Sequence, residues 1–98
     1  MKSKKTKKYK RFRDLLFNVH PMDPHRLTAQ CDLTDEYRIS VVTNLHPYGG
    51  AYGNLSELTF EAAVFKNNEM IHIGVFDQVL GWQTPKQITK IMKKFQKK

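Results

Sequence analysis

The chain has 98 residues, which is enough for one small domain with one hydrophobic core, and its formal net charge is +8 at neutral pH. Its one cysteine, Cys31, excludes an internal disulfide framework, and no stretch approaches the roughly 18 apolar residues of a membrane span. No apolar run follows the basic start, so we expect no secretion signal and a cytoplasmic protein.

The positive charge is concentrated at the two ends of the chain. Residues 1–13 carry eight lysines and arginines and no acid, and residues 84–98 carry six lysines and no acid. The middle, residues 14–83, holds three basic residues and all nine acids, a net charge of −6. Such segregation favours association with a charged partner.

The first predicted elements are an arm and a helix. Residues 1–8 are rich in Lys, Ser and Thr with nothing to bury, so we expect a disordered basic arm before a single domain over residues 9–98. From Tyr9 onward, apolar residues recur at helical spacing; these are Phe12, Leu15, Leu16 and Val19. Pro21 disfavours helix at the residue before it, so this helix should end near His20.

Alternating apolar residues then predict strands. The alternation is weak over residues 27–33, which we expect to form an edge strand, and strong over residues 37–44. The glycine-rich segment 46–54 leads into a second strong strand over residues 55–65. We expect these two strong strands to pair and to form the sheet around which the chain is organised.

The last third predicts a hairpin and a second helix. Asn67-Asn68 fits a two-residue turn into a strand over residues 70–76, and Val79, Leu80 and Trp82 are expected to cover one edge of the core. Thr84 and Pro85 are typical of a helix start. The apolar residues that follow have the spacing of the first helix; they are Ile88, Ile91, Met92 and Phe95.

The predicted fold class is α+β. It comprises a disordered basic N-terminal arm, an N-terminal helix, a three- or four-stranded antiparallel sheet and a C-terminal helix, with both helices on one face of the sheet. In that arrangement the charged sides of the two helices would form one continuous positive surface.

Short motifs between residues 37 and 95 resemble a group of small phage and prophage proteins. The motifs are residues 41–44, the Tyr48-Gly49-Gly50 loop, Gly53, Glu57, residues 63–64 and 79–82 before the C-terminal helix. The resemblance implies a phage-type source, a location in the host cytoplasm and an α+β fold. It carries over no reaction and no functional residue.

The two cationic ends are the main candidate site, which we expect to contact nucleic-acid phosphates. Its predicted residues are Lys4, Lys5, Lys7, Lys8, Lys10, Arg11, Arg13, Lys86, Lys90, Lys93, Lys94 and Lys97. Because lysine is a point charge and rarely reads base edges, the expected binding is independent of nucleic-acid sequence. An acidic protein surface is an alternative partner, and lysine-rich ends also serve solubility alone.

A partner-binding loop around Tyr48 and Tyr52 is the second candidate, since two tyrosines can stack on bases or anchor a protein. The glycines there can instead provide turn geometry while the tyrosines cover the sheet edge. The alternative function is that of a protein-interaction module or an inhibitor of a host enzyme, which would use this loop or the acidic middle of the chain. A structural role in an assembly is a third class of function. The acids are Asp32, Asp35, Glu36, Glu57 and Glu61.

Neither a cofactor nor a metal is expected. His20, Asp23, His25 and Cys31 are zinc-type ligands, but their spacing matches no known zinc motif. No phosphate-binding loop or nucleophile elbow is present, so we expect a non-enzymatic protein. Glu57 and Glu61 lie four apart in a predicted strand, which would place both carboxylates on one face.

Overall fold

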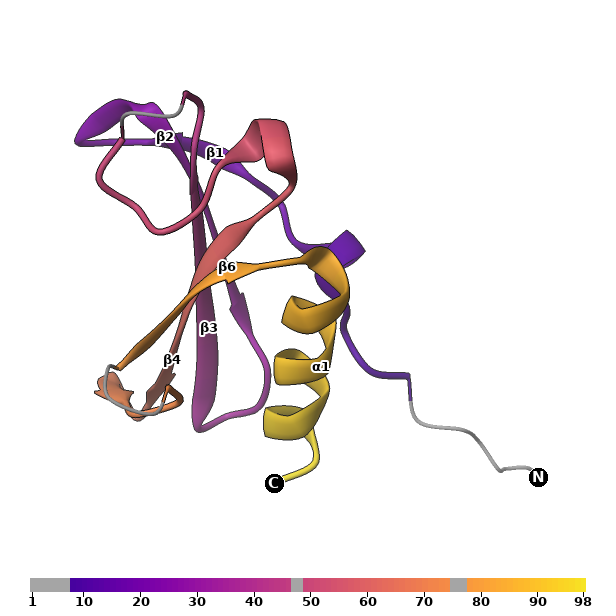
Figure 1. The fold of residues 1–98 in the computed structure, drawn as a ribbon. Helices are drawn as coiled ribbons and strands as arrows, with labels where there is room; N and C mark the ends of the chain where they lie inside the picture. Colours follow the sequence, from indigo (N-terminus) through magenta and orange to yellow (C-terminus); the bar gives the residue numbers. More distant parts are fainter. Residues whose placement is uncertain (1–7, 47–48, 75–77) are drawn as a thin grey trace.

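The computed structural model describes residues 8–46, 49–74 and 78–98, and it shows an antiparallel sheet with one α-helix against one face (Figure 1). In chain order, with η for a one-turn 3-10 helix, the elements are η1 (Phe12–Asp14), β1 (Asn18–His20), β2 (Asp23–Asp32), β3 (Tyr37–Asn44), η2 (Leu55–Glu57), β4 (Phe60–Lys66), β5 (Glu69–Ile71), β6 (Val79–Gln83) and α1 (Pro85–Gln96). Strands β1 to β5 neighbour one another in chain order, and β6 pairs with β4. The α+β class is confirmed, whereas the predicted three or four strands are too few, because the described residues form six.

The pairing of β3 with β4 at the centre of the sheet is confirmed. The register places Ile39 opposite Val64 and Val41 opposite Ala62, and all four side chains are fully buried. The predicted strand over residues 55–65 began too early. Asn54 caps η2 by accepting a hydrogen bond from the Ser56 amide at 3.1 Å, so the chain makes a 3-10 turn before β4 begins.

The predicted N-terminal helix is wrong. Residues 12–14 form a single 3-10 turn, and residues 18–20 form β1, which pairs with β2. Leu16 and Val19, half of the expected apolar stripe, are 81% and 55% exposed. The Asp14 carboxylate accepts a hydrogen bond from the Arg11 amide at 2.8 Å at the start of this turn. Pairing with the otherwise open edge of β2 satisfies backbone groups that a short helix would leave to water.

The weak signal over residues 27–33 belongs to a long inner strand, so the edge-strand prediction is also wrong. β2 lies between β1 and β3, and β1 forms the edge. β2 contains Pro24 because the β1–β2 ladder shifts register between Val19 and His20, at the end of the hairpin. Proline is tolerated at such a shift, since its missing amide hydrogen is not needed there.

The turn at Asn67-Asn68 is confirmed, with φ angles of 51° and 71° that suit a two-residue hairpin. The strand after it, β5, ends at Ile71, so the prediction of a strand is wrong for residues 72–74, while Val75 and Phe76 lie outside the described residues. Residues 79–83 form the strand β6 instead of a simple core cover, and Trp82 is 55% exposed.

The C-terminal helix begins where the sequence predicts. The Thr84 hydroxyl accepts a hydrogen bond from the Gln87 amide at 3.2 Å, and the Gln87 side chain accepts one from the Thr84 amide at 2.8 Å. None of the described helices is long and apolar enough to span a bilayer.

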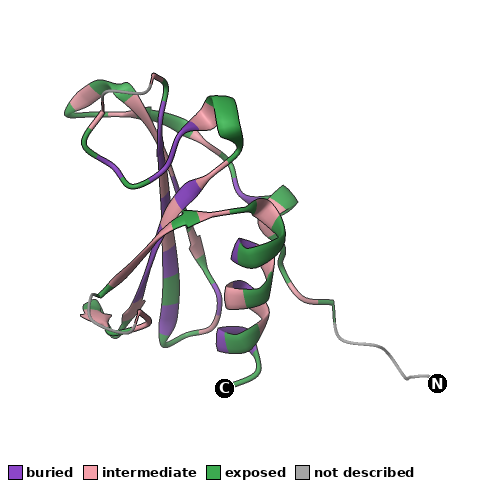
Figure 2. Cartoon of the chain, viewed as in Figure 1, coloured by how far each residue is buried: buried purple, intermediate pink, exposed green. Residues whose placement is uncertain are grey.

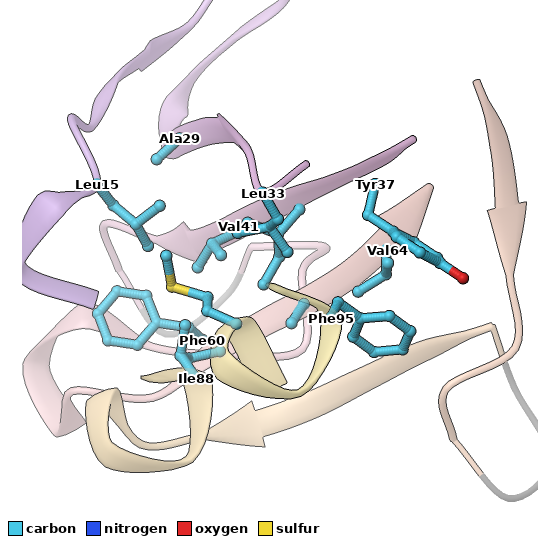
Figure 3. Packing of buried hydrophobic residues seen from close by; sticks show 12 residues of the cluster. Leu15, Ala29, Leu33, Tyr37, Val41, Phe60, Val64, Ile88 and Phe95 are labelled. Atoms are coloured by element: carbon cyan, nitrogen blue, oxygen red, sulfur yellow. The ribbon is translucent and has the colours of Figure 1, made fainter. Parts of the chain in front are cut away.

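The core lies between α1 and the sheet (Figures 2 and 3). Ile88 and Met92 are fully buried, and the Phe95 ring lies 5.2 Å from the Tyr37 ring, centroid to centroid. Burying an apolar side chain of this size contributes about 1.5–3 kcal/mol. These contacts fix the rotation of α1 about its axis, and therefore fix which of its side chains face solvent.

Candidate nucleic-acid interface

The solvent face of α1 is lined with lysines. Lys86, Lys90 and Lys94 follow one another at intervals of four residues and are all exposed, as is Lys97. Lys93 is half-buried on the same side of the helix. Because Ile88, Met92 and Phe95 hold the opposite side against the sheet, these lysines form one cationic stripe along the helix.

The N-terminal segment runs antiparallel beside α1 as an extended chain. The Gln96 side chain accepts a hydrogen bond from the Lys10 amide and donates one to the Lys10 carbonyl, both at 2.8 Å. Nearer the start of the helix, the Phe12 amide donates to the Thr89 hydroxyl at 2.9 Å. Both cationic ends of the chain therefore lie side by side, although only one of them is an α-helix.

The cationic side chains of the N-terminal segment differ in their exposure and in their hydrogen bonds to the rest of the protein. Lys8, Arg11 and Arg13 are exposed. Lys10 is also exposed, but its Nζ donates to the Asp32 carbonyl at 2.6 Å, which ties it to the end of β2. Lys4, Lys5 and Lys7 lie outside the described residues. We call the cationic surface the described set Lys8, Lys10, Arg11, Arg13, Lys86, Lys90, Lys93, Lys94 and Lys97.

Within the described part of the chain, no ion pair joins the cationic surface to a carboxylate, although Asp14 lines a hollow together with Lys8, Lys10 and Arg13. The ion pairs found there join Arg26 to Asp23 at 3.5 Å and Arg38 to Asp32 at 2.8 Å, all four residues belonging to the sheet. Lys97 and Lys94 have ring partners instead, with their Nζ atoms 5.8 Å from the Tyr9 centroid and 5.6 Å from the Phe95 centroid. Such contacts leave the positive charge available to a ligand.

A hollow of about 680 Å³ runs along the lysine stripe. Its lining residues are Gln83, Gln87, Lys90, Ile91, Lys93, Lys94 and Lys97. Four of the seven are lysines, and none is acidic. The hollow therefore suits an anion or a chain of anions.

The tyrosine-glycine loop is folded onto the sheet by Asn44. The Asn44 Nδ2 donates to the carbonyls of Ala51 and Gly53 at 2.7 Å each, and its Oδ1 accepts from the Ala51 amide at 3.2 Å. A Cβ on Gly49 would overlap the Asn44 amide, so glycine is required there. Tyr52 is 56% exposed, as the prediction of a partner-binding loop requires, and Tyr48 lies outside the described residues.

The acids of the middle separate into two places. Asp32, Asp35 and Glu36 surround a hollow of about 530 Å³ at the β2–β3 turn, which Lys10 and Arg38 also line. Glu57 lies in η2, while Glu61 lies in β4 and accepts a hydrogen bond from the Tyr52 amide at 2.8 Å. The expectation that Glu57 and Glu61 share one strand face is therefore wrong.

The zinc-type ligands are engaged in local contacts. The His25 and His46 rings lie 4.7 Å apart, and the His20 Nδ1 accepts from the Met22 amide at 3.1 Å. In the part of the chain that the structure describes, no three His, Cys, Asp or Glu side chains gather in a metal-binding arrangement. Burial raises the pKa of the Cys31 thiol, and the nearby Lys10 charge offsets part of that effect.

Sequence reasoning missed two surface features. Trp82 is 55% exposed and lies where the β4–β6 ladder shifts register, a feature that no sequence pattern predicts. An apolar hollow of about 280 Å³ also lies beside the exposed Leu58, and η2 forms part of its wall. The residues around that hollow are Phe12, Arg13, Leu15, Phe17, Leu27, Leu55, Leu58 and Phe60.

Comparison with known proteins gives no relative. No family model matches the chain, and no curated protein or solved structure shows a significant match. The resemblance to phage and prophage proteins stays a prediction, and any function must be argued from the surface itself.

Proposed function

We propose that this protein is a non-enzymatic, phage-type accessory factor that binds nucleic acid through its cationic surface, without sequence specificity. The observation that carries the proposal is the docking of the N-terminal segment beside α1 by the Gln96 and Thr89 hydrogen bonds. Two segments about eighty residues apart in the chain thereby place their cations on one surface.

The spacing of the lysines destabilises α1. Lys86, Lys90 and Lys94 repel one another at intervals of four residues, and such like-charged pairs destabilise a helix by about 0.2–0.5 kcal/mol each. Lys86 also lies in the first turn, where the helix dipole disfavours a cation. Solubility alone would be served by mixed charges, which avoid this repulsion. A polyanionic partner would remove the repulsion on binding.

The surface is better suited to binding phosphates than to recognising a specific base sequence. Lysines dominate the described part of the surface, and ammonium groups attract phosphates without fixing their geometry. Each neutralised phosphate of duplex DNA releases condensed counterion, so the logarithm of the binding constant should fall with the logarithm of the salt concentration, by about 0.9 per contact.

The test is binding of a labelled DNA duplex, followed by fluorescence anisotropy at about 50 and 200 mM salt. We expect measurable binding at low salt that weakens at least tenfold at high salt. The test variant is Lys90→Gln/Lys94→Gln, which should weaken binding and reduce the salt slope by about two. A control with the same net charge is Arg38→Gln/Lys66→Gln, since Arg38 and Lys66 lie in the sheet. Absence of binding at low salt, or equal effects of both variants, would contradict the proposal.

A protein-interaction module, such as an inhibitor of a host enzyme, is the second candidate function. The observation that favours it is the apolar hollow beside η2, where the Phe12 and Phe60 rings lie 4.9 Å apart and Leu58 is 56% exposed. An apolar interface changes little with salt. A partner captured from host lysate that survives both nuclease and high salt, and is lost in Leu58→Asn, would support this second function.

A further inference from the structure

The apolar hollow beside η2 contains a cluster of three phenylalanine rings. The Phe12 and Phe60 rings lie 4.9 Å apart, and the Phe17 ring lies 5.8 Å from Phe12 and 5.6 Å from Phe60, centroid to centroid. Phe60 is buried, whereas Phe12 and Phe17 are only half-buried. Leucines complete the apolar lining; they are Leu15, Leu27, Leu55 and Leu58. The hollow therefore offers both aromatic and aliphatic surface to a ligand.

The hollow lies on the side of the sheet that α1 covers. Leu15 and Phe60, which line it, belong to the same core cluster as Ile88 of α1 (Figure 3). The Phe12 amide bonds to the Thr89 hydroxyl of α1 at 2.9 Å, which holds the η1 side of the hollow against the helix. The hollow and the cationic surface are therefore on one side of the molecule.

Arg13 joins the hollow to the cationic surface. It is exposed, and among the described residues that line the apolar hollow it is the one that carries a charge. Arg13 also lines the hollow beside Cys31 together with Lys8 and Lys10, although Asp14 lies there too. A row of cations therefore continues from the apolar hollow along the N-terminal segment, so a ligand can place an apolar group and an anion side by side.

Folding alone does not account for a leucine at position 58. Its φ angle of 53° lies in the left-handed region, which is unfavourable for a residue with a Cβ. Glycine would avoid this strain, and asparagine would reduce it. The Leu58 side chain is 56% exposed, so packing within the protein offsets little of the strain. Strained residues gather at binding sites, and a ligand in the hollow would cover this side chain.

Resting on the proposed function, we infer that the ligand is single-stranded nucleic acid and that the apolar hollow receives one of its bases, while Arg13 and the neighbouring cations contact its phosphates. A nucleotide joins a flat base to an anion, which matches an aromatic hollow with an arginine beside it. In a duplex the bases are stacked and paired, and a base would have to leave the helix to enter the hollow. Every base has a π-face, so this contact keeps the binding independent of sequence.

The leucine methyl groups report on the hollow in the wild-type protein, through NMR spectra. The probes are a short oligothymidylate, an abasic oligomer with the same number of phosphates, and a duplex of the same length. A base in the hollow should shift the methyl signals of Leu27, Leu55 and Leu58 through its ring current, and the abasic oligomer, although it binds, should not. Leu16 is the internal control, since it is 81% exposed and is not among the residues that line the hollow. Equal shifts with both oligomers would contradict insertion of a base.

The test variant is Leu58→Asn and its matched control is Trp82→Asn. Both residues have left-handed backbones, with φ of 53° and 56°, and similar exposure, and asparagine tolerates that conformation. Leu58→Asn should weaken oligothymidylate binding about fivefold and leave duplex binding unchanged. Trp82→Asn should change neither, because Trp82 is not among the lining residues. Thermal melts check that both variants fold, and the wild-type methyl shifts decide the question if Leu58→Asn does not.

The outcomes separate the two proposals. Binding of all three nucleic acids with the leucine methyl signals unmoved, or equal oligothymidylate affinities of wild type and a folded Leu58→Asn, would overturn base insertion. Either result would leave the phosphate-binding function in place and the hollow open to the protein partner of the second candidate function. Failure of the wild type to bind any of the three at low salt would overturn both proposals.

Discussion

Residues 12–19 and residues 88–95 have the same apolar spacing and lie beside cationic neighbours, yet they take up different structures. Residues 88–95 belong to a three-turn helix that Thr84 caps and whose apolar side is buried. Residues 12–19 form one 3-10 turn and an edge strand, with the Asp14 carboxylate bonded to the Arg11 amide at their start. The difference shows that the same apolar spacing gives a helix where the sheet covers the apolar side, and other structure where a strand edge is open to pairing.

The two segments also depend on each other unequally. Leu15 packs in the same core as Ile88 and Met92, whereas the backbone of residues 10–12 is held by side chains that α1 provides. Loss of α1 should therefore release residues 8–12. Loss of residues 8–11, which add nothing to the core cluster, should leave the apolar contacts of α1 in place.

The largest predicted effect comes from the apolar side of α1. Met92→Ala removes a fully buried side chain and should lower the free energy of unfolding by about 2–5 kcal/mol. Chemical denaturation measures it, and Leu16→Ala is the control, since Leu16 is 81% exposed and belongs to the other segment. Equal losses in both variants would show that the two apolar stripes are used alike, against the structure.

Gln96→Ala should have the next largest effect, because it leaves the Lys10 amide and carbonyl without their partner. We expect a loss of about 1–3 kcal/mol and faster hydrogen exchange at the Lys10 and Phe12 amides, with the exchange of α1 unchanged. The control is Gln30→Ala on the exposed side of β2. Unchanged exchange at Lys10 would mean that the Gln96 side chain does not hold the segment.

Thr84→Ala tests the side-chain cap at the start of α1. The variant loses the hydroxyl that accepts from the Gln87 amide and should be less stable by about 1 kcal/mol. Thr84→Ser retains the hydroxyl and should stay close to wild type, with both stabilities measured by thermal unfolding. If both variants lost the same stability, the hydroxyl would not be acting as the cap.

The smallest predicted effect is on the reactivity of the Cys31 thiol, which lies beside the docked N-terminal segment. Cys31 lines a hollow with Lys8, Tyr9 and Lys10, and burial raises the pKa of its thiol. A raised pKa keeps more of the reactive thiolate protonated, so alkylation at mildly alkaline pH should be slower than for an exposed thiol. The raised pKa also predicts that stability is full below the pKa of the unfolded thiol and falls as the pH rises through the folded one.

Alkylation of Cys31 in Gln96→Ala gives the matching comparison. Release of residues 8–12 would expose the thiol, so its reaction should be faster in Gln96→Ala than in wild type, while Gln30→Ala should react as the wild type does. Equal rates in all three proteins would show that the N-terminal segment does not shield Cys31.

Much of the fold could be predicted from the sequence where local signals agreed with one another. Alternation over residues 37–44, the Asn67-Asn68 turn and the Thr84 cap each specified an element that the structure shows. Residues 12–19 could not be predicted in the same way, because their helical spacing competes with pairing to the edge of β2, a contact that only the assembled sheet provides. Trp82 lies at a register shift between two strands, which leaves no local signal in the sequence.

The candidate site was predictable in composition but not in geometry. The segregation of lysines is plain in the sequence, whereas their union on one surface depends on Gln96 and Thr89, two polar residues within an otherwise amphipathic helix. Gln96 is 7% exposed, and a buried glutamine needs partners, but nothing local to it indicates that Lys10 would supply them.

The salt dependence of duplex DNA binding tests most directly whether the two cationic ends act as one surface. We would compare wild type with Arg11→Gln/Arg13→Gln, Lys90→Gln/Lys94→Gln and the combination of both pairs. Each pair should reduce the salt slope by about two, and the combination by about four. A slope that responds to the helix pair alone, or to neither pair, would contradict a shared surface.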